Sequence, residues 1–386
     1  MSAPGQTAAI SVFTDPIIAE LGISRNALST SYLIGTLAGA SAMPLVGRAL
    51  DRFGIGRTMA VIGAVFGGVL IGLSLVTGIV GLTAGFIGIR MAGQGALGLA
   101  ASTAVAVHVT RRRGLALGVT SAVGSAGISL APVVLERVIS TYGMDTAWRA
   151  EGLAVWAVVI PLALFVFGRA NRPAPSLESH EASAPSTTHR RGSWTVRGAV
   201  RTPMFWTIAA ALAAQGMLST ALNFHQIAAL GEQGLSPAQA ALNFLPQAVA
   251  TMTLTIGVGA LTDKFAPKYG VMFAMTLLAA ALLTLPAVSN LATALVYGSL
   301  LGASGGALRT VEAAAFAHYF GTSQLGAIRG IATTINVGST AFGPLALSLG
   351  QQALGSYGTT SALMAVVPIL VALAAAVVRA PGASEH

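Results

Sequence analysis

Apolar runs of about 20 residues recur along the whole chain, and each is long enough to cross a lipid bilayer as a helix. Charged residues or Pro- and Gly-containing breaks separate these runs. Inside a bilayer every backbone N–H and C=O must be paired within the protein, so membrane-spanning helices are the expected structure. The pattern predicts an all-α membrane protein with twelve spans, at residues 3–20, 28–50, 58–78, 82–108, 114–138, 148–168, 203–229, 237–261, 269–288, 291–318, 326–352 and 359–379.

The composition agrees with a membrane protein and excludes several other classes. Hydrophobic residues make up 54% of the chain and charged residues only 9%, whereas about a quarter of an average soluble domain is charged. The chain has no Cys, which excludes a disulfide framework and a Cys-ligated metal site. The net charge of +9 indicates Lys and Arg gathered on one membrane face, so we expect the lipid bilayer and no nucleic acid as a partner.

The positions of the cations predict the orientation. Of the 21 Lys and Arg residues, Arg25, Arg137 and Arg149 lie in odd-numbered turns or at the span ends that border them, and Arg90 and Arg309 lie in the interior of spans. The others lie in even-numbered turns, in the polar stretch after span 6 or at the C-terminus. Because positive loops resist translocation, we expect both termini to be cytoplasmic in a bacterial inner (plasma) membrane.

Two segments interrupt the regular series of spans. The first predicted span contains Pro4, Asp15 and Pro16, and we hypothesise that the native first helix begins upstream of Met1. Residues 170–201 are polar and rich in Pro, Ser and Arg, which predicts a cytoplasmic linker. The expected domains are therefore a six-helix bundle at 1–169, the linker at 170–201 and a second six-helix bundle at 202–386.

A short motif is repeated at the same place in each half. The first copy, between spans 2 and 3, contains Gly47, Asp51, Arg52, Gly54 and Arg57. The second copy, between spans 8 and 9, begins at Gly259 and contains Asp263 and Lys264. Parallel repeats of this kind are how many transporters form two bundles around a central site.

These residues resemble a known family. The first copy matches the loop 2–3 signature of the major facilitator superfamily, and Arg90, Gln94, Gly95 and Gly98 resemble its span-4 motif. The segments at 11–29, 44–54 and 318–330 are similar to the monocarboxylate and oxalate/formate branch. The resemblance implies transport of small organic anions, with spans 1, 4, 7 and 10 lining the cavity. Carriers of that branch often have an Arg in span 8, where this chain has Thr255.

We expect the repeated motif to act as a gate. In this hypothesis Asp51 accepts hydrogen bonds from a neighbouring helix N-terminus in one state and releases them in the other, with Gly47, Arg52, Gly54, Arg57, Asp263 and Lys264 completing the gate. The alternative is a solvated loop that only fixes the topology.

Charged residues inside the spans are the first candidates for a binding site. Arg90 lies about ten residues into span 4, near the bilayer centre, where an unpaired charge is costly. It either binds substrate or braces the bundle by donating to backbone carbonyls. Arg309 and Glu312 share one face of span 10. Arg309 is a candidate anion ligand and Glu312 a candidate proton acceptor, and the alternative is a structural ion pair.

Uncharged polar residues complete the candidate set. His225 and Asn223 lie in span 7, and His225 is either a cavity residue that titrates near neutral pH or a solvated residue near the membrane boundary. Tyr32, Gln94 and Asn336 are polar residues in apolar spans, which often face a cavity or join helices.

The combined prediction is a secondary transporter, not an enzyme. Two cations and one carboxylate suit a small organic anion, moved by alternating access and either coupled to a proton or exchanged for another solute. A multidrug or neutral-solute exporter of the same fold is the alternative, favoured by the missing span-8 Arg. No nucleotide-binding or catalytic motif indicates an ATP-driven pump or a membrane enzyme. We expect no cofactor, no metal site and a monomer.

Overall fold

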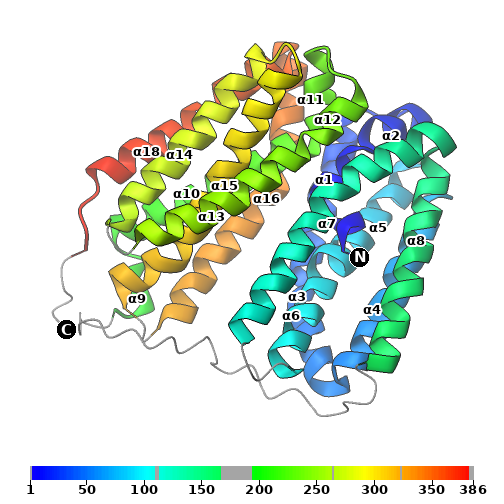
Figure 1. Ribbon diagram of the computed structural model, residues 1–386, viewed down its shortest axis with the longest axis horizontal. Coiled ribbons are helices and arrows are strands. Elements are labelled where there is room, and N and C mark those ends of the chain that lie inside the picture. Colours follow the sequence, from blue (N-terminus) through cyan, green and yellow to red (C-terminus); the bar gives the residue numbers. More distant parts are fainter. Residues whose placement is uncertain (1, 109–112, 167–193, 263–264, 322–323, 382–386) are drawn as a thin grey trace. The chain divides into compact units, whose positions relative to one another are not determined.

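The computed structural model describes residues 2–108, 113–166, 194–262, 265–321 and 324–381. Within these ranges every regular element is a helix, which confirms the predicted all-α class, and Figure 1 shows long helices that run back and forth. The first eleven elements are η1 (Ala3–Gly5), α1 (Thr7–Ser11), α2 (Thr14–Leu21), α3 (Arg25–Phe53), α4 (Ile55–Leu73), α5 (Ile79–Ile89), the π-helix η2 (Arg90–Ala96), α6 (Leu97–His108), α7 (Arg113–Tyr142), α8 (Met144–Pro161) and the π-helix η3 (Leu162–Val166).

The remaining elements follow the segment 167–193. They are α9 (Val196–Ala199), α10 (Pro203–Phe224), α11 (Gln226–Glu232), α12 (Pro237–Leu242), α13 (Phe244–Thr262), α14 (Pro267–Thr284), η4 (Leu285–Ala287), α15 (Leu291–Phe320), α16 (Leu325–Leu354), α17 (Tyr357–Met364) and α18 (Val366–Val377). The chain forms two compact units. Unit 1 comprises 1–177, 223–228 and 236–244, and unit 2 comprises 178–222, 229–235 and 245–386.

Nine helices in the described part of the chain are long and apolar enough to cross a membrane. Helical residues also occupy the other three predicted spans, but these do not meet the same criterion. The predicted span 3–20 is divided among η1, α1 and α2, and the span 82–108 is interrupted by η2. The third, α16, is 30 residues long but carries a run of Thr, Ser and Asn in its middle. The count of twelve spans is therefore only partly confirmed.

The turn between α3 and α4 is tighter than the sequence predicts. The expected loop between residues 50 and 58 is almost entirely helical, because α3 continues to Phe53 and α4 begins at Ile55. Gly54 alone joins the two helices, with φ of 81°. A residue with a side chain rarely adopts this left-handed conformation, so glycine is the residue that permits the turn. Thr58 reinforces the turn by donating its hydroxyl to the Ala49 carbonyl, at 3.0 Å.

In unit 1, α4 and α8 pack closely through small residues. A Cβ at Gly152 would lie 2.7 Å from the Gly67 carbonyl oxygen, so the two backbones touch there. Small residues allow this close approach between membrane helices. Trp148 on α8 stacks on Phe13 with ring centroids 3.8 Å apart, and Arg149 donates to Ser74 at the end of α4. These contacts fix α8 against both α4 and the junction between α1 and α2, where Phe13 lies.

In unit 2, threonines hold α13 against α15. The Thr251 hydroxyl donates to the Gly302 carbonyl at 2.9 Å, and the Thr310 hydroxyl donates to the Thr255 carbonyl at 3.0 Å. The Thr255 hydroxyl donates to Thr251 at 2.7 Å and approaches the Gly306 carbonyl at 3.4 Å. Interhelical hydrogen bonds and small residues are typical of helix association in membranes.

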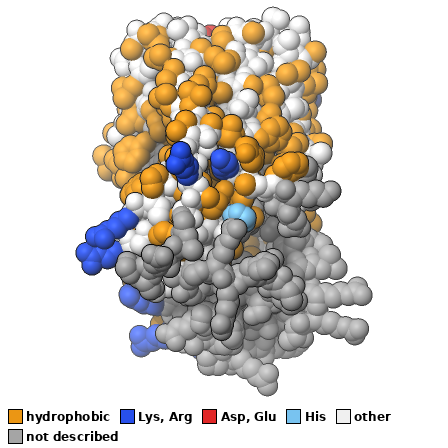
Figure 2. Space-filling model, turned by 90° about the vertical axis from the view of Figure 1, so that its left-hand side faces the viewer, with side chains coloured by type: hydrophobic (Ala, Val, Ile, Leu, Met, Phe, Trp, Pro, Cys, Tyr) orange, Lys and Arg blue, Asp and Glu red, His pale blue; other side chains and the backbone are white. Residues whose placement is uncertain are grey.

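Cations gather at one end of unit 2. Arg197, Arg201, Lys268, Arg329 and Arg379 lie at or beside the starts of α10, α14 and α16 and the end of α18, which share one end because the helices alternate in direction. At the opposite end of unit 2, the described segments 229–235, 285–290 and 355–356 contain Glu232 and no Lys or Arg. Figure 2 shows hydrophobic side chains over the upper part of this face, with the visible Lys and Arg side chains from its middle downward.

Candidate functional site

Arg90 lies deep in unit 1, at the point where a span changes its helical geometry. It is the first residue of the π-helix η2, and only 2% of it is exposed. Short π-helical segments occur frequently at functional sites, because the wider turn moves side chains and backbone groups away from their regular positions. The sequence predicts the depth of Arg90 but not this irregularity.

Neutral groups from three helical segments surround the guanidinium of Arg90. Its Nε donates to the Thr36 hydroxyl at 3.1 Å, and its Nη1 donates to the Gly5 carbonyl at 3.1 Å and to the Thr7 hydroxyl at 3.4 Å. The guanidinium carbon lies 4.5 Å from the centre of the Tyr32 ring, which is a cation–π distance. The Tyr32 hydroxyl is 2.7 Å from that of Thr7, so the network closes on itself.

Gly5 allows η1 to approach η2 and Arg90 closely. A Cβ at Gly5 would lie 2.5 Å from the Ile89 carbonyl oxygen and 2.8 Å from the Gln94 amide nitrogen. Any side chain at this position would therefore push η1 away from η2, and the Gly5 carbonyl would move away from Arg90. The close backbone approach places an acceptor on Arg90 without adding a negative charge.

The charge of Arg90 is not balanced by any residue that the structure describes. Among the described residues, all of its hydrogen-bond acceptors are hydroxyl or carbonyl oxygens, and its buried Nη2 has no partner. The bracing role therefore accounts for Nε and Nη1 but leaves Nη2 available. A buried guanidinium with a free N–H donor is suited to bind a carboxylate or another oxyanion.

Arg309 and Glu312 do not form the ion pair that was the structural alternative. Arg309 is exposed on α15, Glu312 is half-buried, and no ion pair joins them in the described part of the chain. Arg90 belongs to unit 1 and Arg309 to unit 2, so each is a separate candidate.

His225 is a buried residue, not a solvated one. It is 0% exposed and lies between α10 and α11, in the part of unit 1 that also contains Asn223 and Phe224. Its ring contacts Phe224 edge-on, with centroids 4.9 Å apart. The Oδ1 of Asn223 is buried and has no partner among the described residues.

The other predicted polar residues have different surroundings. Tyr32 is part of the Arg90 network, whereas Gln94 is exposed on η2. Asn336 on α16 lies against Gly216 on α10, where its Oδ1 occupies the place that a Cβ would take. Asn336 therefore packs between two helices of unit 2.

The first copy of the repeated motif is a helical corner. Gly47 and Asp51 lie in α3, Gly54 is the turn residue, and Arg52 and Arg57 are exposed on either side of it. The guanidinium of Arg52 lies over the Phe53 ring at 5.3 Å. The side chain of Asp51 and the whole of Asp263 and Lys264 lie outside the described residues, so the gate stays a prediction.

Sequence reasoning did not single out Glu151 or, apart from Tyr32, the partners of Arg90. Glu151 lies in α8, within the candidate span 144–165, and its buried Oε2 has no partner among the described residues. An acidic residue inside a predicted span was the available signal. Thr7, Thr36 and Gly5 carry no local sequence signal of a role beside Arg90.

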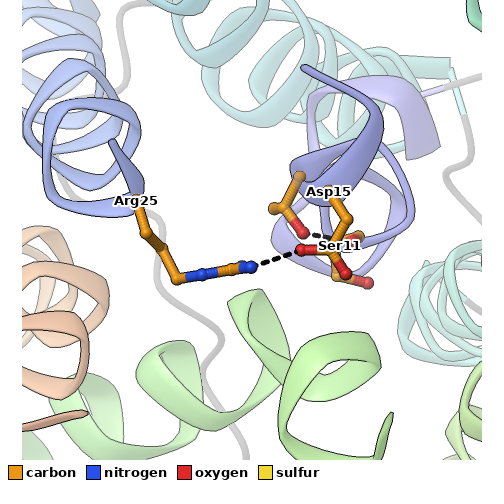
Figure 3. A network of polar contacts seen from close by, with 4 residues as sticks. Ser11, Asp15 and Arg25 are labelled. Atoms are coloured by element: carbon orange, nitrogen blue, oxygen red, sulfur yellow. Dashed lines mark hydrogen bonds and ion pairs between the residues drawn. The ribbon is translucent and has the colours of Figure 1, made fainter. Parts of the chain in front are cut away.

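One ion pair closes the turn between α2 and α3. Arg25 at the start of α3 donates to Asp15 on α2 at 2.6 Å, and Figure 3 shows the two side chains meeting beside Ser11. Both side chains are partly exposed, so the pair orders the turn and contributes little to stability. Within the described residues, no group of three His, Cys, Asp or Glu side chains is arranged to hold a metal ion.

Comparisons with known proteins point to one family. The sequence pattern of the Major Facilitator Superfamily matches residues 1–242. Among solved structures, a bacterial homologue of the human lysosomal transporter Spinster is similar in its inward-facing, unoccupied conformation, with a TM-score of 0.71, 16% identity and coverage of 97% of this chain and 93% of that chain. Its inward-facing, occupied conformation has a TM-score of 0.68 at the same identity and coverage. No curated protein matches the chain.

Proposed function

This chain belongs to the major facilitator superfamily, a family of membrane transporters, and on that premise we propose that it carries a small organic anion of the monocarboxylate type. The chain is a membrane transporter and not an enzyme. Its substrate, its direction and its coupling ion are the subject of the proposal.

The unbalanced charge of Arg90 carries the proposal. A cation inside a membrane span costs several kcal/mol unless it is paired or hydrated. Arg90 is 2% exposed, has only neutral acceptors among the described residues and keeps one donor nitrogen without a partner. An anionic substrate would supply the missing charge and accept from Nη2, whereas a cation would be repelled.

Binding in this arrangement requires movement. Because Arg90 is nearly inaccessible, a substrate reaches Nη2 only when the contacts of Thr7, Tyr32 or the neighbouring helices change. We propose alternating access of two bundles, 1–169 and 202–386, joined by the linker 170–201. The motif around Asp51 and its copy at Asp263 and Lys264 would act as the gate. The residues that would contribute to substrate binding from the second half of the chain are Arg309, His225, Asn223 and Asn336.

A proton is the proposed coupling ion, and the transporter is proposed to be a monomer. Glu312 and Glu151 are carboxylates inside candidate spans, and no described residue forms an ion pair with either. Such groups are typical of proton relays in transporters. The basic end of unit 2 is proposed to face the cytoplasm of a bacterial cell.

Uptake into proteoliposomes tests the substrate class. We expect saturable uptake of a small carboxylate, and we expect Arg90→Met to reduce the apparent affinity by about tenfold to 100-fold, the equivalent of one charged hydrogen bond of about 1.5–3 kcal/mol. Arg90→Lys keeps the charge but loses the fork of donors, so its apparent affinity should lie between those of the wild type and Arg90→Met. Arg137→Gln is the matched control, because Arg137 is exposed on α7. Equal carboxylate uptake by the wild type and Arg90→Met would refute the proposal.

The same preparation tests the coupling. With an inward proton gradient, we expect carboxylate uptake to rise several-fold in the wild type. We expect Glu312→Gln or Glu151→Gln to remove this stimulation while exchange of labelled for unlabelled substrate persists. A gradient without effect on the wild type excludes proton coupling but leaves the anion site intact.

A multidrug or neutral-solute exporter is the second candidate, and Thr255 favours it. The resembling carboxylate carriers often have an Arg there, whereas here the Thr255 hydroxyl donates to the Thr251 carbonyl and lies against α15. No Lys or Arg occurs in the described part of α13. Transport of a cationic or neutral drug, together with no carboxylate-dependent signal, would favour this candidate over the anion carrier.

A further inference from the structure

A cavity of about 470 Å³ lies at the basic end of unit 2. Its walls come from the segment before α10, the start of α10 and the residues that follow α18. The residues that define it here are Trp194, Arg201, Pro203, Met204, Val378 and Arg379. We call this cavity the basic groove.

The basic groove carries positive charge that the described part of the protein does not neutralise. No side-chain hydrogen bond or ion pair holds Arg201 or Arg379 in the described residues, and both are exposed. The 22-residue helix α10 begins at the groove and has no acidic residue in its first turn. Its partial positive charge adds to that of the two guanidinium groups.

Hydrogen bonds and a ring contact hold the wall that carries Trp194. The Trp194 amide donates to the Phe320 carbonyl at 3.4 Å, and the two rings meet edge-on with centroids 5.9 Å apart. The Val196 amide donates to the Gln324 side chain at 2.8 Å. These contacts tie the segment before α10 to the end of α15 and the start of α16.

The groove lies at the level where two membrane spans end. The candidate span of α10 begins at Pro203, and that of α17 and α18 ends at Val377. Large apolar side chains next to it are exposed, with 54% of Trp206, 58% of Leu373 and 81% of Val377 accessible. Charge inside the groove and apolar surface beside it match the two parts of a phospholipid.

We propose that the basic groove binds the phosphate headgroup of an anionic phospholipid, whose acyl chains lie along the exposed apolar residues of α10 and α18. Basic pockets at the ends of transmembrane helices commonly bind anionic headgroups, and Trp is enriched at the membrane–water interface. Arg201 and Arg379 bind the phosphate, and Trp194 packs against the glycerol region. This site is independent of the proposed transport substrate.

Native mass spectrometry of the delipidated full-length protein tests the proposal, with palmitoyl-oleoyl phosphatidylglycerol as the probe. We expect the double variant Arg201→Gln/Arg379→Gln to bind this lipid roughly 30-fold more weakly, since each arginine near an anionic lipid contributes about fivefold. Arg201→Lys/Arg379→Lys retains the charge and should retain most of the affinity, which also shows that the altered groove still folds. Arg197→Gln is the matched control, because Arg197 is exposed on the adjacent helix α9 but does not line the groove.

Three results would overturn the proposal. Equal weakening by Arg197→Gln would show a general charge effect without a defined site. Equal binding of phosphatidylcholine would show that the lipid charge is irrelevant. Competition by millimolar inorganic phosphate alone would identify a soluble-anion site in place of a lipid site.

Discussion

Replacing Thr36 by Val isolates the hydrogen bond that orients Arg90. Thr36 is 5% exposed, and its hydroxyl accepts from the Arg90 Nε at 3.1 Å. Valine has nearly the same shape, so the change leaves no cavity and removes only the acceptor. Because the donor is charged and buried, we expect the free energy of unfolding to fall by about 1.5–3 kcal/mol.

Unfolding in mixed micelles of increasing SDS fraction measures this loss. Thr36→Ser keeps the hydroxyl and serves as the matched control, with an expected loss below about 1 kcal/mol for the deleted methyl group. In a background of Arg90→Met, the Thr36→Val change should cost less than about 0.5 kcal/mol, because the donor is already absent. The double-mutant cycle therefore yields a coupling energy of about 1–3 kcal/mol between the two residues.

The same variant connects stability to transport. Without its Nε acceptor, the guanidinium loses part of its fixed orientation, so the apparent affinity for a carboxylate should also decrease. If Thr36→Val unfolds at the same SDS fraction as the wild type and the cycle shows no coupling, the hydrogen bond does not contribute and the description of the Arg90 network is wrong.

Three further changes test other parts of the structure. Gly302→Ala places a Cβ against the backbone of α13 and should lower the free energy of unfolding by about 1–3 kcal/mol. Gly257→Ala has open space around it and should be neutral or stabilising by up to about 1 kcal/mol. If both variants unfold at the same SDS fraction, the packing of α15 on α13 is contradicted. Glu232→Gln weakens the interaction of the carboxylate with the first backbone N–H of α17 and should cost about 0.3–1 kcal/mol, which a thermal unfolding scan at low salt detects and a scan at high salt should not. Arg25→Gln breaks the pair with Asp15 and should change stability by less than about 1 kcal/mol, so a larger loss would show that the turn is more important than its exposure suggests.

The sequence predicts most of the helical architecture of this protein. Each predicted span coincides with helical residues in the described part of the chain, because long apolar runs have only one way to pair their backbone in lipid. The errors lie at the ends and interruptions. The predicted loop between α3 and α4 is a single residue, Gly54, in the structure, and the span at 82–108 contains a π-helix that begins at Arg90. Hydropathy does not encode either feature, since both depend on local backbone geometry.

The candidate site was predictable only in part. A charge in the middle of an apolar run identified Arg90, because its burial cost is visible in the sequence. Its partners Thr36 and Gly5 lie 54 and 85 positions away along the chain, and nothing in their local sequence marks them. For Glu151, the sequence shows that an acidic residue lies within a span. It does not show that, among the described residues, the buried Oε2 of Glu151 has no partner.

Taken alone, the sequence determined that the chain crosses a membrane as helices and which of its charges must enter the bilayer, because both follow from the free energy of transferring a residue from water to lipid. Only the tertiary structure decided which neutral groups meet Arg90 and that one of its donors has no partner in the described part of the chain. It also decided that Arg201 and Arg379 border one cavity. Hydrogen bonds and cavities depend on distances between segments far apart in the chain, and a one-dimensional pattern of hydropathy does not contain those distances.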